Sequence, residues 1–327
     1  MTKKPRQVPS GYEFLQGVHE LDERVDRLKE ETSDGGEGHE EELRQLERER
    51  DEVLASLVDH LTAYQRVKLA RHPHRPQARD YIKAIFEDFV ELHGDHRFGD
   101  DKAIITGFAR IDGRPIMLVA QHKGRDTKEK MAYNFGMPNP EGYRKALAKM
   151  ELAEKFRLPV VCMIDTLGAA PGLGAEERGQ AMAIAENIWR MSGLRTPIVI
   201  LITGEGCSGG ALGIGIGDRF AMMENAYYSV ISPEGCAAIL WRSGEMADRA
   251  AEAMKLTAQD MLSRGIIDEI VREPLGGAQR DPEAAAASVK DYLVRVLDEL
   301  TTADGDIDEL LEKRYQRYRR LGEFQKV

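Results

Sequence analysis

Cysteine is scarce in this chain of 327 residues. Only Cys162, Cys207 and Cys236 occur, far apart and without a CxxC pair. Structural zinc and iron–sulfur sites are usually built from about four such ligands, so we expect none from this chain alone. So few thiols also give no disulfide framework and are typical of a reducing compartment. The composition therefore predicts a cytoplasmic protein.

Long apolar runs are also missing. No stretch reaches the roughly 18 apolar residues of a membrane helix, and residues 1–10 lack the apolar centre of a signal peptide. The net charge is −10, which argues against binding nucleic acid over the whole surface. An anionic ligand would need a local basic patch. Apolar residues make up 42% of the chain, enough for one large domain or two small ones.

A Walker phosphate loop is absent as well. The chain has no GxxxxGK[ST] motif. A GxGxxG-like fragment at 204–209 follows an apolar run, but no acidic residue is suitably placed for a ribose, so a dinucleotide site is disfavoured. Of the eight histidines, only His122 lies near the glycine turns described below. Cys207 could be a nucleophile at a helix start, but filling a small space is the better interpretation.

The first part of the chain has helical periodicity. Leu21, Val25 and Leu28 recur at helical spacing, as do the leucines from Leu43 onward, and the polar glycine-rich segment 32–38 interrupts the pattern. This predicts a helical hairpin or arm for packing or dimerisation. The segment 71–76 then reads as a proline-punctuated linker with solvated charges. We assign residues 1–79 to the arm and linker, and 80–327 to the main domain with its C-terminal helices.

From Asp80 onward, short apolar runs alternate with helical segments. The expected strands are 116–120, 160–164, 198–202, 220–223 and 227–231. The expected helices are 142–156, 176–192, 211–215, 236–262 and 282–327, with Ser232 and Pro233 as a helix start. Apolar strands that alternate with helices indicate an α/β fold with largely parallel pairing.

Three glycine-rich turns follow these strands, at 121–125, 165–174 and 204–211. Ligands of open α/β sheets bind at the carboxyl ends of strands, where these turns fall. Gly209 and Gly210 open a helical run at Ala211, so their amide N–H groups could form an oxyanion hole; a purely structural turn is the alternative. Acidic and basic side chains are few there. This profile suits stabilisation of an enolate or a ureido oxyanion.

Several ordered strings within residues 81–318 resemble one family. They are 122–130 (HKGRDTKEK), 134–138 (NFGMP), 140–147 (PEGYRKAL), 174–180 (GAEERGQ), 208–212 (SGGAL), 230–237 (VISPEGCA), 273–278 (EPLGGA) and 314–317 (RYQR). The chain is thereby identified as a member of the alpha subunits of the acetyl-CoA carboxylase carboxyltransferase. Two positions depart from the family's loop, with Leu167 for a proline and Ala170 for a tyrosine, and Cys207 replaces a common glycine.

The resemblance implies a ClpP/crotonase-like superhelix of ββα units with an N-terminal helical arm and C-terminal helices. It also implies an α2β2 enzyme that moves the carboxyl group of carboxybiotin, carried on the biotin carboxyl carrier protein, to acetyl-CoA. The product is malonyl-CoA, the first committed compound of fatty acid synthesis. The beta subunit would carry a zinc ribbon, and a separate biotin carboxylase would consume the ATP.

The resemblance also suggests roles for single residues. The amides of Gly209 and Gly210 would hold the ureido oxygen of biotin, beside the helix start at Ala211. Gly168 and Ala169 would offer a further donor. Lys123 and Arg125 would attract anionic groups, with simple solvation as the alternative, and the linker charges at 71–76 could meet coenzyme A phosphates.

Three other functions stay open from the sequence. The chain could be a non-catalytic assembly subunit whose site was lost at Leu167 and Ala170. It could be a stand-alone crotonase-type hydratase, isomerase or decarboxylase, although no acid–base pair is evident. It could also carboxylate a longer acyl-CoA.

Overall fold

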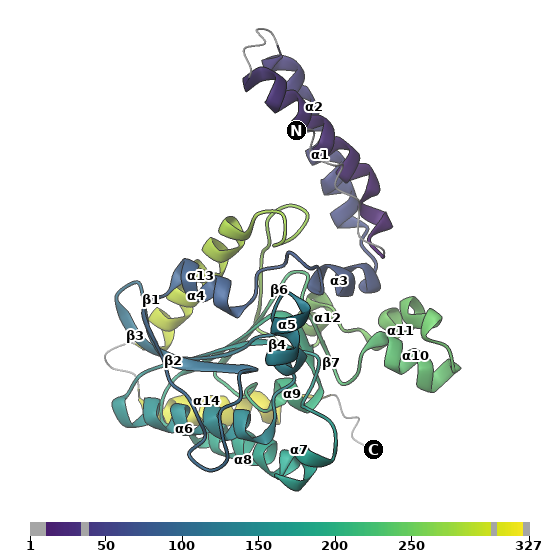
Figure 1. Ribbon diagram of the computed structural model, residues 1–327. Coiled ribbons are helices and arrows are strands. Elements are labelled where there is room, and N and C mark those ends of the chain that lie inside the picture. The colour runs from purple at the N-terminus through teal and green to yellow at the C-terminus, as the bar shows by residue number, and fades with distance from the viewer. Residues whose placement is uncertain (1–10, 34–38, 302–305, 323–327) are drawn as a thin grey trace.

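The protein is built around one mixed eight-stranded sheet (Figure 1). The computed structural model describes residues 11–33, 39–301 and 306–322. Along the sheet the order is β1-β2-β3-β4-β5-β6-β8, and β7 pairs with β5. The strands are β1 (Glu87–Glu91), β2 (Ile104–Ile111), β3 (Arg114–Gln121), β4 (Val160–Thr166), β5 (Ile198–Cys207), β6 (Arg219–Met223), β7 (Tyr227–Ser229) and β8 (Glu269–Val271).

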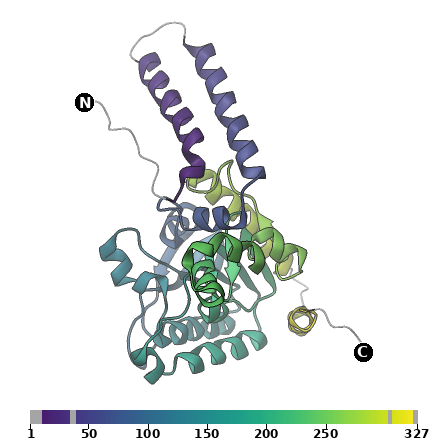
Figure 2. The ribbon, with the colours of Figure 1, turned by 90° about the vertical axis from the view of Figure 1, so that its right-hand side faces the viewer.

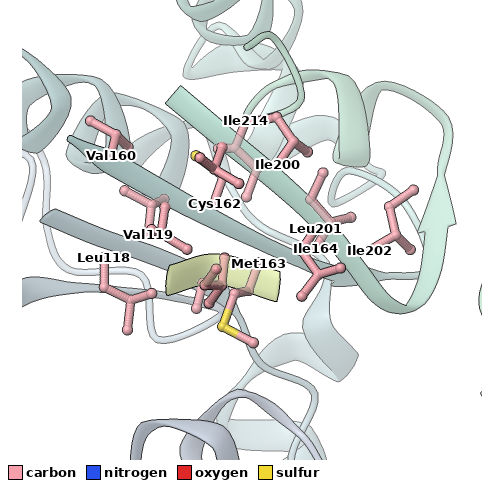
Figure 3. Packing of buried hydrophobic residues seen from close by; sticks show 14 of the residues in the cluster. Leu118, Val119, Val160, Cys162, Met163, Ile164, Ile200, Leu201, Ile202 and Ile214 are labelled. Carbon is pink, nitrogen blue, oxygen red and sulfur yellow. The ribbon is translucent and has the colours of Figure 1, made fainter. Parts of the chain in front are cut away.

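The centre of the sheet is parallel. β3, β4, β5 and β6 follow one another in parallel register, while β1 and β2 form an antiparallel edge. Every residue of β4 and β5 is buried, as expected for parallel strands covered on both faces. Figure 3 shows the packing of their apolar side chains with those of β3. The labelled residues are Leu118, Val119, Val160, Cys162, Met163, Ile164, Ile200, Leu201, Ile202 and Ile214.

Helices cover both faces of the sheet (Figure 1). On one face lie α4 (Ala78–Ile85) and α13 (Pro282–Leu300), which pack on each other. The other face carries α6 (Pro140–Phe156), α8 (Gln180–Gly193) and α14 (Ile307–Arg319). The remaining helices are α3 (Ala63–Ala70), α5 (Thr127–Ala132), α7 (Leu173–Glu177), α9 (Ser208–Leu212), α10 (Pro233–Trp241), α11 (Ala247–Met254) and α12 (Ala258–Ser263), with the 3-10 turns η1 (Glu13–Leu15), η2 (Asn134–Gly136) and η3 (Gly244–Met246).

An antiparallel pair of helices projects from this body (Figures 1 and 2). It consists of α1 (Gln16–Ser33) and α2 (Glu40–Asp59), which share a small apolar cluster of Leu21, Val25 and Leu46. Arg280 of the body bonds to Asp22 at 2.7 and 2.8 Å. The predicted hairpin is confirmed, and its role in dimerisation stays a prediction, as does the domain boundary after residue 79. Residues 34–38 of the predicted break lie outside the described residues.

The sequence located most of the central elements but misplaced some of their ends. Each of the five predicted strands is present, yet three further strands, β1, β2 and β8, were not foreseen. β5 continues to Cys207, so the first half of the predicted turn at 204–211 is wrong: residues 204–207 belong to the strand, and 205–207 pair with β7. The predicted helices at 176–192 and 236–262 are each broken into shorter ones. Ser232 caps α10 as expected, since its hydroxyl accepts from the Gly235 N–H at 3.1 Å. No helix within the described ranges is long and apolar enough to span a membrane.

Candidate active site

The turn between β5 and α9 presents free backbone amides. Ser208, the first residue after the strand, takes a left-handed conformation (φ 55°), and α9 starts there at once. Because the first N–H groups of a helix have no intrahelical acceptor, those of Gly209 and Gly210 remain available as donors. Ser208 is exposed and Gly209 is partly exposed, whereas Gly210 and Ala211 are buried. The turn is thus open on one side and packed on the other.

Two of the predicted loops meet at Gly210. A Cβ atom added there would lie 2.3 Å from the carbonyl carbon of Gly168 and 2.6 Å from the nitrogen of Ala169. Contacts this short exclude any side chain, so glycine is required for the loops to approach each other. The loop after β4 and the start of α9 are therefore adjacent, and the structure brings together the four candidates Gly168, Ala169, Gly209 and Gly210.

The loop after β4 is held by hydrogen bonds of its own. The Thr166 hydroxyl donates to the Gly136 carbonyl at 2.6 Å and accepts from the Gly168 N–H at 3.0 Å. Gly168 has φ 142°, a conformation that L-residues rarely adopt. The Ala170 N–H donates to the Pro138 carbonyl at 2.9 Å. Leu167, which replaces the family's proline, is 42% exposed and so leaves an apolar side chain at the rim.

The two basic candidates have different surroundings. Lys123 lies between two buried carboxylates, with its Nζ 2.7 Å from Asp165 and 3.0 Å from Glu205. Simple solvation is wrong for Lys123, because the network already neutralises and partly buries it. Arg125 is exposed and pairs with Asp80. Of the two, only Arg125 keeps a charge that a ligand could reach easily.

The linker arginines continue this network, contrary to the expectation of solvated charges. Arg71 contacts Glu205 at 2.8 Å and Glu234 at 2.7 Å, and Arg75 contacts Glu273 at 2.6 Å. Arg75 also donates to the carbonyl of Thr203 in β5 at 2.9 Å. The segment after α3 is therefore fixed to the sheet by ion pairs. The prolines of this segment are typical of a free linker. The sequence alone does not indicate that carboxylates far along the chain pair with its arginines.

A pocket of about 270 Å³ opens beside this network. It combines basic and apolar side chains from the linker, from the turn after β3 and from the loop after β4. Among its lining residues are Arg71, His72, Gln77, Lys123, Arg125, Lys130, Phe135 and Leu167. The pocket adjoins the carboxyl ends of the central strands, where the sequence places the ligand.

Side chains that could act as nucleophile or base are not activated here. Burial raises the pKa of the Cys207 thiol to about 11, so the thiol stays protonated at neutral pH. Burial lowers the pKa of His122 to about 4, and its ring packs edge-on against Tyr133 at 4.6 Å between centroids. Both observations agree with a site that works through backbone donors. In the described part of the chain, no group of three or more His, Cys, Asp or Glu side chains could hold a metal ion.

Solved structures of three other proteins are similar to this chain in fold. Transcarboxylase 12S with methylmalonyl-coenzyme A superimposes with a TM-score of 0.57 at 18% identity, over 71% of this chain and 44% of that one. The beta subunit of P. aeruginosa geranyl-CoA carboxylase superimposes with a TM-score of 0.54 at 16% identity, over 82% of this chain and 48% of that one. A chain of a Pseudomonas malonate decarboxylase hetero-tetramer superimposes with a TM-score of 0.55 at 19% identity, over 68% of this chain and 91% of that one. These likenesses show the fold, and the predicted crotonase-like fold is confirmed.

Curated relatives show the family to which this chain belongs. Acetyl-coenzyme A carboxylase carboxyl transferase subunit alpha of Geobacter metallireducens is 52% identical over 95% of this chain and 97% of the relative. The subunit of the same name from Rhodopirellula baltica is 49% identical over 96% and 98%. The family described as acetyl co-enzyme A carboxylase carboxyltransferase-like matches residues 11–322. The chain belongs to this family, which confirms the predicted resemblance and the predicted enzyme class, a biotin-dependent carboxyltransferase.

Proposed function

We propose that this chain is the half of an acetyl-CoA carboxylase carboxyltransferase that steadies the ureido oxygen of carboxybiotin. The overall reaction transfers the carboxyl group to acetyl-CoA and gives malonyl-CoA, the first committed step of fatty acid synthesis. The observation that carries the proposal is the meeting of two amide-bearing loops at Gly210, in a chain of this family. We expect the reaction to take place in the cytoplasm.

The amide turn fits an oxygen on which negative charge grows. Carboxybiotin supplies the carboxyl group, and biotin freed of it can take up a substrate proton. The N–H groups of Gly209 and Gly210, with Gly168 and Ala169 beside them, would donate to the ureido oxygen. One such fixed donor is typically worth about 100- to 1000-fold in rate. The neutral His122 and Cys207 would take no part in proton transfer.

The basic pocket gives this chain a second role, toward anionic groups. Arg125 would attract phosphates or the carboxylate of a substrate, and Ala211 would line the approach to the turn. The partly buried Lys123 would act indirectly, by holding Asp165 and Glu205 beneath the loops. We assign the thioester of acetyl-CoA to the partner chain.

The proposal requires further subunits. We infer an α2β2 assembly with a beta subunit that carries a zinc ribbon. The biotin carboxyl carrier protein would deliver carboxybiotin, and biotin carboxylase would recharge it with ATP. The experiment is to measure malonyl-CoA formation from acetyl-CoA and carboxybiotin, by this chain alone and with its beta subunit. Activity of the mixture alone supports a shared site, activity of the chain alone would favour a stand-alone crotonase enzyme, and inactivity of both would favour an assembly role.

Substitution of Gly210 tests the oxyanion hole itself. Gly210→Val, or the milder Gly210→Ala, places a Cβ against the Gly168–Ala169 backbone, so the loops must separate. We expect at least about a 100-fold loss of transfer, as for removal of one donor. Gly193→Ala, at the end of α8, is the matched control, because nothing lies within 4 Å of its added Cβ. Unchanged transfer by a folded Gly210 variant that still binds the beta subunit would refute the assignment.

A further inference from the structure

The carbonyl group of Gly210 has lost its ordinary helical partner. In a longer α-helix it would accept from the N–H of residue 214, four positions later. Here α9 ends at Leu212, and the Ile214 N–H donates instead to the Ala211 carbonyl at 3.3 Å. Gly210 is buried, and a buried carbonyl without a donor costs free energy.

Two side chains from other elements replace the missing donor. The Nε2 of Gln121, the last residue of β3, donates to the Gly210 carbonyl at 2.8 Å. The hydroxyl of Tyr143, in α6, donates to the same oxygen at 3.3 Å. Both side chains are buried, with 1% and 0% of their surface exposed. Burial raises the pKa of Tyr143 well above its ordinary value, so its hydroxyl keeps the proton that it donates.

A peptide group is rigid, so fixing the Gly210 carbonyl oxygen also fixes the N–H of Ala211, which belongs to the same peptide group. The N–H groups of Gly209 and Gly210 belong to the two preceding peptide groups of the same one-turn helix, and they are held through it. Holding the carbonyl of Gly210 sets the plane of the Gly210–Ala211 peptide, and in the first turn of a helix the carbonyls and the N–H groups point in opposite directions. The two side chains therefore hold the turn from the side opposite to its free amides. The ring of Tyr143 adds a steric constraint, because a Cβ on Gly213 would lie 2.5 Å from it.

We propose that Gln121 and Tyr143 are positioning residues, which aim the amides of the Gly209–Gly210 turn by holding the Gly210 carbonyl. The inference rests on the proposed oxyanion role of that turn and names the side chains that maintain its geometry. Neither residue touches the substrate in this scheme. Both act through the backbone, so their removal should change the rate of the chemical step more than the binding of acetyl-CoA.

The test is steady-state kinetics of the complete complex with the beta subunit. Gln121→Met keeps the length of the side chain and removes the donor, and Tyr143→Phe removes only the hydroxyl. We expect kcat to fall about 10- to 100-fold for Gln121→Met, since small misplacements of catalytic groups cost up to about 100-fold. The longer bond of Tyr143 predicts a smaller loss, about 3- to 10-fold. The KM for acetyl-CoA should change less than about twofold for both, as for interactions made only in the transition state.

The chain supplies close controls for both substitutions. The Nε2 of Gln279 donates to the Gly276 carbonyl at 2.6 Å, and its Oε1 is buried without a partner, as is that of Gln121. Tyr292 is a buried tyrosine in α13 whose hydroxyl has no partner. Gln279→Met and Tyr292→Phe should leave kcat within about twofold of the unchanged enzyme, because neither contacts the turn.

The possible results separate this inference from the proposal beneath it. A lower kcat in Gln121→Met and Tyr143→Phe with unchanged KM supports positioning. If Gly210→Ala abolishes transfer while both variants keep full kcat, the positioning role is wrong and the oxyanion hole stands. If Gly210→Ala is also fully active, the oxyanion hole fails first. Equal losses of kcat in the controls, or a parallel rise in KM, would reduce both residues to a structural role. If Gln121→Met does not assemble with the beta subunit, Tyr143→Phe decides alone.

Discussion

Two polar regions lie side by side at the carboxyl ends of β4 and β5, and they handle polarity in opposite ways. The amide turn at Gly209–Gly210 consists of glycines whose N–H donors are left free. The charge network beside it consists of long side chains whose charges are paired: Lys123 with Asp165 and Glu205, and Arg75 with Glu273. From this difference we infer that the turn binds and that the network supports. Free donors can serve a ligand, whereas paired charges fix the loops that carry them.

The two regions also differ in the free energy that their polar groups cost the folded protein. A free amide at the start of a helix is satisfied by water or by a ligand and costs little when exposed. A buried ion pair contributes little more to stability than a pair of apolar side chains would. Removing one partner is destabilising, however, because it leaves an unpaired buried charge. We therefore expect changes in the turn to affect rate more than stability, and changes in the network to affect stability more than rate.

The largest effect on stability should come from Arg75→Met. The side chains of Arg75 and Glu273 are 2% and 0% exposed, so this change strands a buried carboxylate and removes the bond to the Thr203 carbonyl. Breaking such a pair typically costs about 3–5 kcal/mol of unfolding free energy. The midpoint of urea unfolding measures it.

Arg295→Met is the matched control for that change. Arg295 pairs with Glu269 at the surface, where the side chains are 48% and 42% exposed. Exposed pairs contribute roughly 0–1 kcal/mol, so this midpoint should hardly move. Similar losses in the two variants would contradict the division between a supporting network and a binding turn.

A second, intermediate effect concerns the response to acid. Burial alone would raise the pKa of Glu273, but the charge and hydrogen bonds of Arg75, with those from Asn225, hold it below its usual range. A carboxylate with a lowered pKa stabilises the fold fully above its unfolded value, near about 4.3, and loses that contribution as pH falls further. The stability of the protein should therefore drop below about pH 4.3, and Glu273→Gln should flatten this drop.

Urea midpoints measured from pH 7 to pH 3 would check this dependence. Glu273→Gln should start from a lower stability at neutral pH, because it leaves Arg75 without its ion pair. The fall of its urea midpoint from pH 7 to pH 3 should be smaller than that of the unchanged protein. Identical slopes would show that Glu273 is not among the carboxylates that set the acid limit.

The smallest effect should come from Arg125→Met, on binding alone. The side chain is 45% exposed, so its attraction for an anionic substrate is screened by water and salt. An exposed charge of this kind is worth about 0.2–1 kcal/mol, which predicts a rise of about 1.4- to fivefold in the KM for acetyl-CoA, and this rise should shrink at high salt. Arg110→Met, at a similarly exposed arginine of β2, should leave KM unchanged. A loss of stability in Arg125→Met would place the residue in the supporting network instead.

The sequence was most informative where backbone chemistry decides the structure. Gly209 and Gly210 stood out because two glycines between a β-branched run and a helical run are typical of a close backbone approach. The family strings then linked the turn to a reaction. The buried central strands were equally readable, because a run such as 198–202 is apolar throughout. The extension of β5 to Cys207 was missed, since Gly204 and Gly206 resemble turn residues in any local window.

The partners of charged and polar side chains could not be predicted in this way. Arg75 lies between Pro73 and Pro76 in the sequence, and it meets Glu273 only through the folding of the sheet that separates the two residues along the chain. Gln121 and Tyr143 looked like a strand end and a helix residue, and nothing local marks either as a donor to Gly210. The signal that could have found them is indirect: a helix of one turn leaves a buried carbonyl that some distant side chain must satisfy.

The sequence by itself determined the α/β class, the helical hairpin, the buried strands, the family and the glycines of the amide turn. These depend on periodicity, on composition and on conformational freedom, which act over a few residues. Only the tertiary structure decided which charges are paired, that Lys123 is enclosed by carboxylates, and which side chains hold the carbonyl of Gly210. These depend on contacts between residues far apart in the chain, whose free energy exists only once the strands have assembled.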